Sequence, residues 1–302
     1  MKALKTAMVV LMAFAWGCLP LAGRALADQG DRNQGLWTIA GYKVSIDRLG
    51  GSDHLTIWQG RKKLLDHAEH SIELIGARSE DAVQYPLGTD LLGIGAPVLL
   101  AKTYSGGAHC CTDLRVIALG KKVAVLQTIA VGDGAFRLHR IDGEPAPVVS
   151  VNDAVWMFWK ASAAGSHFPT VWMRFDVKQL RFVPALDLMA QQSPPSSEEL
   201  DKLSARARRL DGWALNRARS GQQVPPELLY GLTELIYTGH LADARRFVER
   251  SWMGTPQQLE DFWAEATACR VRRSPYWPAL ASLNHLSAEP PRGNCGTAEE
   301  NG

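Results

Sequence analysis

The segment around residue 109 brings together side chains that could do chemistry. His109 precedes two adjacent cysteines, Cys110 and Cys111, and Asp113 follows shortly after them. A histidine base beside an acid can activate a nucleophile, so His109 with Asp113 would suit a hydrolase. An activated group needs its base placed by the fold, however, and residue spacing does not specify that placement. We therefore assign no catalytic residue.

The sequence lacks the other common catalytic signatures. It contains no G-x-S-x-G elbow, H-E-x-x-H helix, phosphate-binding loop or dinucleotide fingerprint. His67 and His70 have the wrong spacing for two metal ligands on one helix face, and no C-x-x-C pair is present. These patterns favour a non-enzymatic protein without a cofactor, and a hydrolase stays as the alternative.

Two turn-rich segments carry acids that could bind calcium. Asp133 lies between two glycines, and Asp142 and Glu144 lie in the segment Arg140–Pro147. Calcium takes six to eight oxygen ligands, of which these carboxylates supply a part. A calcium-stabilised module centred on Asp142 is therefore a second alternative. The other role for such residues is turn formation, in which aspartate accepts hydrogen bonds from the following amides and glycine adopts positive φ.

The first residues have the pattern of a secretory signal peptide over 1–27. Lys2 and Lys5 form a positive beginning, 7–16 is an apolar run, and 25–27 reads Ala-Leu-Ala before Asp28. The apolar run is too short to span a membrane, and no later stretch is long enough. We expect a periplasmic or secreted protein.

Cys18 raises the alternative of a lipid anchor, because a cysteine near the end of an apolar leader can be a lipidation site. Trp16 before Gly17 fits that motif poorly. Removal of the leader lowers the formal charge from +2 to −1, since Lys2, Lys5 and Arg24 leave with it. A near-neutral chain lacks the basic footprint of a nucleic-acid-binding protein.

Export also places the remaining cysteines in a compartment that permits disulfides. Four cysteines allow three pairings. We expect Cys269 to pair with Cys295, because that bridge closes a modest loop and ties down the tail. Cys110 and Cys111 would then form a strained vicinal disulfide, stay as two thiols, or join His109 in a metal site.

The hydrophobic period divides the 302 residues into two parts. Over 36–190, apolar residues recur at every second position, and glycine and aspartate separate the apolar segments. This pattern predicts an antiparallel β domain. Within it, Val155–Trp159 is one of the expected strands. The segment 191–197 reads Gln-Gln-Ser-Pro-Pro-Ser-Ser and is typical of a linker. The predicted class is therefore α+β.

The period changes to 3.6 over 198–286, which predicts an α-helical domain. Ser196 with Glu199 has the pattern of a capping box, and Thr255 with Gln258 has the same pattern before Leu259. We expect a flexible tail over 287–302, which is rich in proline, glycine and glutamate.

Two segments share a loop pattern that leads into an apolar strand. Asp90–Pro97 precedes Val98, and Arg140–Pro147 precedes Val148. Both resemble the loops of FG-GAP and VCBS-like repeats in integrin-type β-propellers. The runs Tyr104–Cys111 and Ser274–Pro278 are similar to runs in secreted bacterial proteins of unknown role.

The resemblance implies a β-propeller-like repeat, but the β domain has room for three or four blades at most. We therefore expect an open sheet or a sandwich and not a closed propeller.

Aromatic residues gather toward the end of the β domain. Trp156, Phe158, Trp159 and Trp172 lie within 17 residues of one another. If these side chains are exposed, they form a surface for a protein or a glycan. The alternative is that alternation along strands places most of them in the core. We list Trp156, Trp159, Trp172 and His109 as candidate binding residues. The leading hypothesis is an exported binding protein that recognises a protein or a cell-envelope component, with no nucleic acid as partner and an unspecified oligomeric state.

Overall fold

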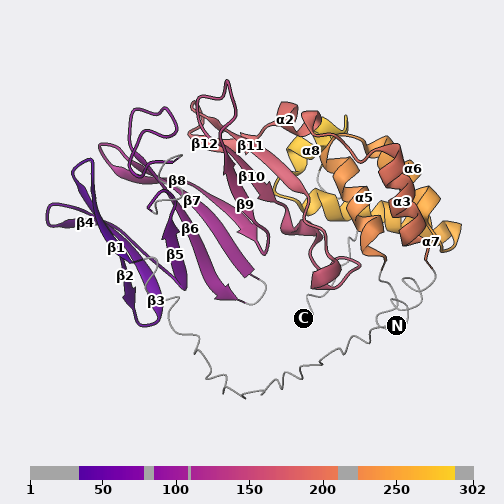
Figure 1. The fold of residues 1–302 in the computed structure, drawn as a ribbon, viewed down its shortest axis with the longest axis horizontal. Helices are drawn as coiled ribbons and strands as arrows, with labels where there is room; N and C mark the ends of the chain where they lie inside the picture. The colour runs from indigo at the N-terminus through magenta and orange to yellow at the C-terminus, as the bar shows by residue number, and fades with distance from the viewer. Residues whose placement is uncertain (1–33, 78–84, 108–109, 210–223, 290–302) are drawn as a thin grey trace, which may run out of the picture. The chain divides into compact units, whose positions relative to one another are not determined.

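Three four-stranded antiparallel sheets follow one another along the chain, and a helical region comes after them (Figure 1). The computed structural model describes residues 34–77, 85–107, 110–209 and 224–289. The predicted α+β class is confirmed, and each sheet is open. His109 and Cys295 lie outside the described residues.

Each sheet is built from strands that are neighbours in the sequence. Sheet A contains β1 (Gly35–Ile39), β2 (Tyr42–Leu49), β3 (Ser52–Gln59) and β4 (Lys62–Glu69). Sheet B contains β5 (Ser71–Leu74), β6 (Val98–Gly107), β7 (Cys110–Leu119) and β8 (Val123–Gly132). Sheet C contains β9 (Phe136–His139), β10 (Val148–Asn152), β11 (Thr170–Asp176) and β12 (Arg181–Pro184). Consecutive strands pair antiparallel, and the register of β6 and β7 shifts between Tyr104 and Gly107.

Sheet B is covered on both faces. Leu99 and Ile117 pack with residues of sheet A, whereas Leu100 and Val116 belong to the core shared with sheet C. Successive side chains of a strand point to opposite faces, so a strand covered on both sides needs an uninterrupted apolar sequence. This requirement explains why the run Val98–Ala101 contains no polar residue.

A side-chain amide joins sheets B and C at their edges. Gln127 of β8 donates from Nε2 to the carbonyl oxygen of Phe182 at 3.1 Å, and the Phe182 amide donates to Gln127 Oε1 at 2.6 Å. The amide thus makes the two hydrogen bonds that a neighbouring backbone residue would make. It satisfies the Phe182 peptide groups on β12.

The described helical region begins directly after the last strand. Its elements are α2 (Leu186–Gln191), α3 (Ser197–Ala207), α5 (Pro226–Tyr237), α6 (Leu241–Ser251), α7 (Pro256–Ala264), the π-helical turn η3 (Glu265–Arg270), the 3₁₀ turn η4 (Val271–Arg273) and α8 (Trp277–Leu283). Both predicted capping boxes are present, Ser196 with Glu199 and Thr255 with Gln258. Within the described ranges, no helix is long and apolar enough to cross a membrane.

The predicted strand Val155–Trp159 is wrong. Residues 154–156 form the 3₁₀ turn η1 (Ala154–Trp156), and the chain continues through irregular turns. Asp153 caps η1, because its side chain accepts a hydrogen bond from the Val155 amide. The apolar run in this segment reflects burial of Trp156 and Trp159 against helices, which a short apolar run alone does not distinguish from pairing in a sheet.

Helices α5 and α6 meet at a glycine. A Cβ atom added to Gly231 of α5 would lie 2.4 Å from the Phe247 ring of α6, and that ring is fully buried. We predict that Gly231→Ala lowers the free energy of unfolding by about 1–3 kcal/mol, because the overpacking outweighs the better helix propensity of alanine. Urea denaturation measures the change. Phe247→Leu should restore part of the loss in the double variant, and a Gly231→Ala variant more stable than the wild type would contradict this packing.

Candidate functional site

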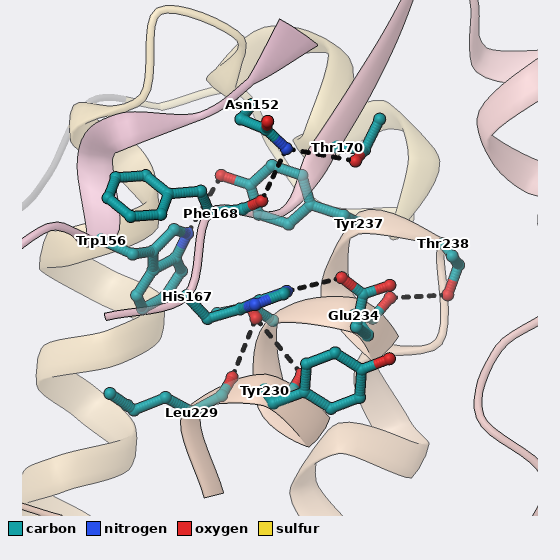
Figure 2. Close-up of polar contacts among 11 residues, drawn as sticks. Asn152, Trp156, His167, Phe168, Thr170, Leu229, Tyr230, Glu234, Tyr237 and Thr238 are labelled. Atoms are coloured by element: carbon teal, nitrogen blue, oxygen red, sulfur yellow. Dashed lines mark hydrogen bonds and ion pairs between the residues drawn. The ribbon is translucent and has the colours of Figure 1, made fainter. Parts of the chain in front are cut away.

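The connection between β10 and β11, residues 153–169, makes many of the described contacts between sheet C and the helices. We call it the β10–β11 loop. It contains η1 and a second 3₁₀ turn, η2 (Ala163–Gly165), and side chains along its length bond to α5, η3 and the turn before α8. Figure 2 shows where its two ends meet α5.

The loop begins at a buried carboxylate. Asp153 is 3% exposed, and its Oδ1 accepts from the Val155 amide at 2.9 Å. Its Oδ2 accepts from the hydroxyl of Tyr237 at 2.6 Å and from the hydroxyl of Ser274. Trp156 Nε1 donates to the Tyr237 oxygen at 3.1 Å. We call Asp153, Trp156, Tyr237 and Ser274 the Asp153 network.

Burial controls the protonation of the Asp153 network. It raises the pKa of the Asp153 carboxyl above its ordinary value, although the Ser274 and Tyr237 hydroxyls act in the opposite direction. Burial and the Asp153 charge raise the pKa of Tyr237 and of Tyr276. Both phenols therefore stay protonated, and that of Tyr237 serves as a hydrogen-bond donor to Asp153.

Further along the loop, Trp159 points inward. Its indole is 5% exposed, lies at 5.2 Å between ring centroids from Phe262 of α7, and donates from Nε1 to Glu265 Oε1 at 2.7 Å. The ammonium of Lys160 lies 2.7 Å from the other oxygen of Glu265. Glu265 thus holds two consecutive loop residues.

Phe158 adopts a backbone conformation that is rare for its type. Its φ is +57°, and Lys160 has φ +54°. Left-handed conformations cost non-glycine residues on the order of 1 kcal/mol each and persist where the surroundings impose them. Phe158 nevertheless leaves its side chain 51% exposed, and its amide donates to Ser166 Oγ at 2.9 Å.

The end of the loop meets α5 at a partly exposed polar pair. His167 Nε2 lies 2.6 Å from Glu234 Oε1, and the imidazole packs edge-on against Tyr230 at 4.7 Å between centroids (Figure 2). Tyr230 is 41% exposed. Asn152 fixes the adjoining backbone, donating from Nδ2 to the Phe168 carbonyl oxygen at 2.9 Å. We call Phe158, His167, Tyr230 and Glu234 the loop face.

The four candidate binding residues do not lie together on one described surface. Trp156 and Trp159 are buried, and they lie in the β10–β11 loop and not on the strand from which alternation predicted their burial. Trp172 lies on β11 and packs against the His139 ring at 4.6 Å. His109 lies outside the described residues. Sequence reasoning missed Tyr230, His167 and Glu234, whose proximity depends on folding.

Two acids of the turn-rich loops, Glu144 and Asp90, have different hydrogen-bond partners. Both carboxylate oxygens of Glu144 accept hydrogen bonds from Arg174, which also bonds to Asp187. Asp90 makes the turn predicted for these loops, because its oxygens accept from the amides of Ile94 and Gly95 at 2.9 and 2.8 Å. Among the residues that the structure describes, no group of three or more acids, histidines or cysteines is arranged to hold a metal.

Two further predictions concern side chains that could react. The disulfide between Cys269 and Cys295 stays a prediction, because Cys295 is not described.

Asp113, the acid of the hydrolase alternative, lies 4.0 Å from Arg115, and burial raises the pKa of its carboxyl. These contacts do not test whether His109 reaches it.

One hydroxyl does lie beside a histidine. Ser150 Oγ is 2.8 Å from His139 Nε2, which is the spacing of a nucleophile and its base. Ser150 is buried, Trp172 packs on the His139 ring, and burial lowers the pKa of the imidazole. This pair therefore packs with Trp172 on the face of sheet C opposite the core that contains Val149 and Val151.

No family model, no curated protein and no solved structure matches the chain. The structure contains three open meander sheets followed by a helical region, and side chains of the β10–β11 loop bond to that region. The resemblance to FG-GAP-like repeats stays a prediction.

Proposed function

We propose that this chain is an exported, non-enzymatic binding protein that recognises a protein or another cell-envelope component through the loop face. The observation that carries the proposal is Phe158, an aromatic side chain half exposed to solvent on a backbone held in the left-handed region. An outlier of this kind needs an explanation, and presentation of the ring to a partner is one that fits.

The anchors around Phe158 support this role. The carbonyl oxygen of Met157, on one side, accepts from Arg270 at 2.7 Å. On the other side, Trp159 and Lys160 both bond to Glu265. These contacts hold the backbone on both sides of Phe158, so little backbone entropy is lost when a partner covers the ring, and aromatic residues of low conformational entropy dominate the affinity of many protein interfaces.

The neighbouring residues supply a polar rim. Ser166 bonds to the Phe158 amide and is followed by His167, whose imidazole contacts both Tyr230 and Glu234. A tyrosine offers a large apolar ring with a hydroxyl at its tip, and a histidine–glutamate pair can accept or donate hydrogen bonds at the edge of a contact. An aromatic centre with a hydrogen-bonding rim is typical of a protein interface.

Matched variants test the proposal. The tagged chain Asp28–Gly302 and its variants are incubated with envelope and culture extracts, and captured species are quantified by mass spectrometry. We predict that Phe158→Ala and Tyr230→Ala each reduce a stoichiometric partner about tenfold or more, because each removes an exposed aromatic contact. Val125→Ala on β8, which also truncates an exposed apolar side chain, should leave capture unchanged.

Two results would contradict the proposal. One is a partner that both aromatic variants retain in full, which would place recognition elsewhere. The other is an extract that yields no partner for the wild-type chain, after which substrate screens would address the hydrolase alternative and calcium titration of the thermal midpoint would address the metal alternative.

A further inference from the structure

Two acidic side chains flank Tyr230, at the end of the loop face that lies on α5. Glu234 is four residues further along α5, so it lies on the same side of the helix. Glu199 belongs to α3, which packs against α5, and its side chain is exposed. Partial burial raises the pKa of the Tyr230 hydroxyl, and the charges of Glu234 and Glu199 raise it further. Both carboxylates therefore lie close to the Tyr230 hydroxyl.

The neighbouring lysine leaves a net negative charge at this end of the loop face. Lys202 of α3 acts on Glu199 and forms an ion pair with Glu198 at 2.6 Å, so these three side chains together carry one negative charge. Glu234 adds a second. His167 can donate a hydrogen bond to Glu234 in its neutral form, which leaves the carboxylate charge in place. A negative surface attracts a cationic ligand and repels an anionic one.

The Tyr230 ring is accessible beside these carboxylates. The side chain is 41% exposed, and His167 packs against it edge-on, at an interplanar angle of 67° (Figure 2). The face of an aromatic ring carries negative charge and attracts cations. A planar cation can therefore stack on this ring and donate hydrogen bonds to a carboxylate at its edge.

We propose that this end of the loop face binds an arginine side chain of the partner, whose guanidinium stacks on Tyr230 and donates hydrogen bonds to the carboxylates beside it. A guanidinium is planar, stays charged and holds five N–H donors in a fixed fork, whereas an ammonium is a hydrated point charge. The inference rests on the proposed function and names the chemistry of the partner, which is a basic protein surface. The same carboxylates repel an anionic polysaccharide or lipid.

The chain offers variants that remove charge and keep the local structure. Glu199 closes the capping box of α3, and glutamine closes the corresponding box of α7 at Gln258, so Glu199→Gln removes the charge and keeps the cap. Glu234→Gln keeps an oxygen that can accept a hydrogen bond from His167. Asp142→Asn is the matched control. Asp142 is exposed in the connection between β9 and β10, at the end of β10 opposite the β10–β11 loop.

Binding of short peptides, measured by NMR titration of the chain Asp28–Gly302, is the test. The probes are a blocked hexapeptide with two arginines, the same peptide with two citrullines, which are neutral isosteres of arginine, and the same peptide with two glutamates. We expect the arginine peptide to bind about tenfold or more tightly than the citrulline peptide, because charge-assisted hydrogen bonds are lost, and the glutamate peptide not to bind.

The variants assign the binding to this end of the loop face. Tyr230→Ala and the double variant Glu199→Gln/Glu234→Gln should each weaken binding of the arginine peptide about tenfold. Tyr230→Phe keeps the ring and should bind as the wild type does, and so should Asp142→Asn. Far-UV circular dichroism establishes that each variant is folded. The inference is overturned if the arginine peptide does not bind, if the citrulline peptide binds equally well, or if the double variant binds as the wild type does.

Capture from extracts distinguishes failure of this inference from failure of the proposed function. A partner that Tyr230→Ala loses and that the double glutamine variant retains in full would overturn the arginine inference and leave the loop face as a binding surface. A partner that Phe158→Ala and Tyr230→Ala both retain would contradict the proposed function itself.

Discussion

Asp153→Ala is expected to lower the free energy of unfolding by about 3–5 kcal/mol. The substitution removes one carboxylate and leaves three donors without their acceptor: the hydroxyls of Tyr237 and Ser274 and the amide of Val155. Each unsatisfied buried donor costs about 1–3 kcal/mol, offset in part because a buried carboxylate no longer has to be desolvated. Chemical denaturation followed by tryptophan fluorescence measures the change.

A double-mutant cycle shows whether the loss comes from the Asp153 network. Tyr237→Phe removes one donor and leaves the ring in place. The two substitutions together should cost less than the sum of their separate effects, by about 1–3 kcal/mol, because they share one interaction. Additive effects would mean that Tyr237 and Asp153 stabilise the fold independently, contrary to their 2.6 Å contact.

The same carboxyl gives stability a pH dependence of known sign. Burial raises its pKa in the folded state above the ordinary value of about 3.9. Above that value the unfolded chain has lost the proton that the folded chain still holds, so the Asp153 contribution falls as pH rises toward the folded-state pKa. Asp153→Asn lacks this dependence. The free energy of unfolding of the wild type minus that of Asp153→Asn should therefore decrease as pH rises from about 4. An increase of this difference with pH would contradict a raised pKa for Asp153.

Trp159→Ala is the second large effect, with an expected loss of about 3–5 kcal/mol. It empties the volume between Trp156 and Phe262, whose rings both lie 5.2 Å from the Trp159 indole, and it removes the hydrogen bond to Glu265. The variant should also lose the capture assigned to the loop face, because Phe158 precedes it and shares its anchors.

A smaller change separates packing from support of the loop. Trp159→Phe keeps an aromatic ring but cannot donate to Glu265, so we expect a milder loss of stability and a measurable loss of capture. Trp172→Phe on β11 is the matched control, since it shortens a tryptophan that packs against His139 away from the loop face. Full capture by Trp159→Ala at temperatures where it is folded would show that the loop needs no such support.

The sequence predicted those parts of the fold that depend on neighbouring residues. The turn between β3 and β4 follows from Gln59-Gly60-Arg61, where Gly60 has φ +55°. The two predicted capping boxes, at Ser196 and Thr255, begin α3 and α7. Capping residues and period act within a few positions, so a local pattern specifies them.

The candidate site depends on residues far apart in the chain, and local patterns do not specify it. Asp153 contacts Tyr237 and Ser274, which are 84 and 121 positions away, and Trp159 contacts a residue 106 positions away. The apolar run from 155 to 159 predicted a strand because the helices that bury Trp156 and Trp159 cannot be identified from the segment itself. The division of the strands into three sheets was not predicted either, because the strands of all three sheets follow one another along the chain with the same apolar period.

The sequence-local sheets and the long-range loop contacts also imply an order of assembly. Meander strands close short segments of chain, whereas the Asp153 network must bring together residues more than 80 positions apart. Contacts of low sequence separation form faster, so we expect the sheets to form early and the helices to dock late. The loop face then exists only in chains that have finished folding. On the proposed function, the recognition surface would therefore be the last part of the molecule to form.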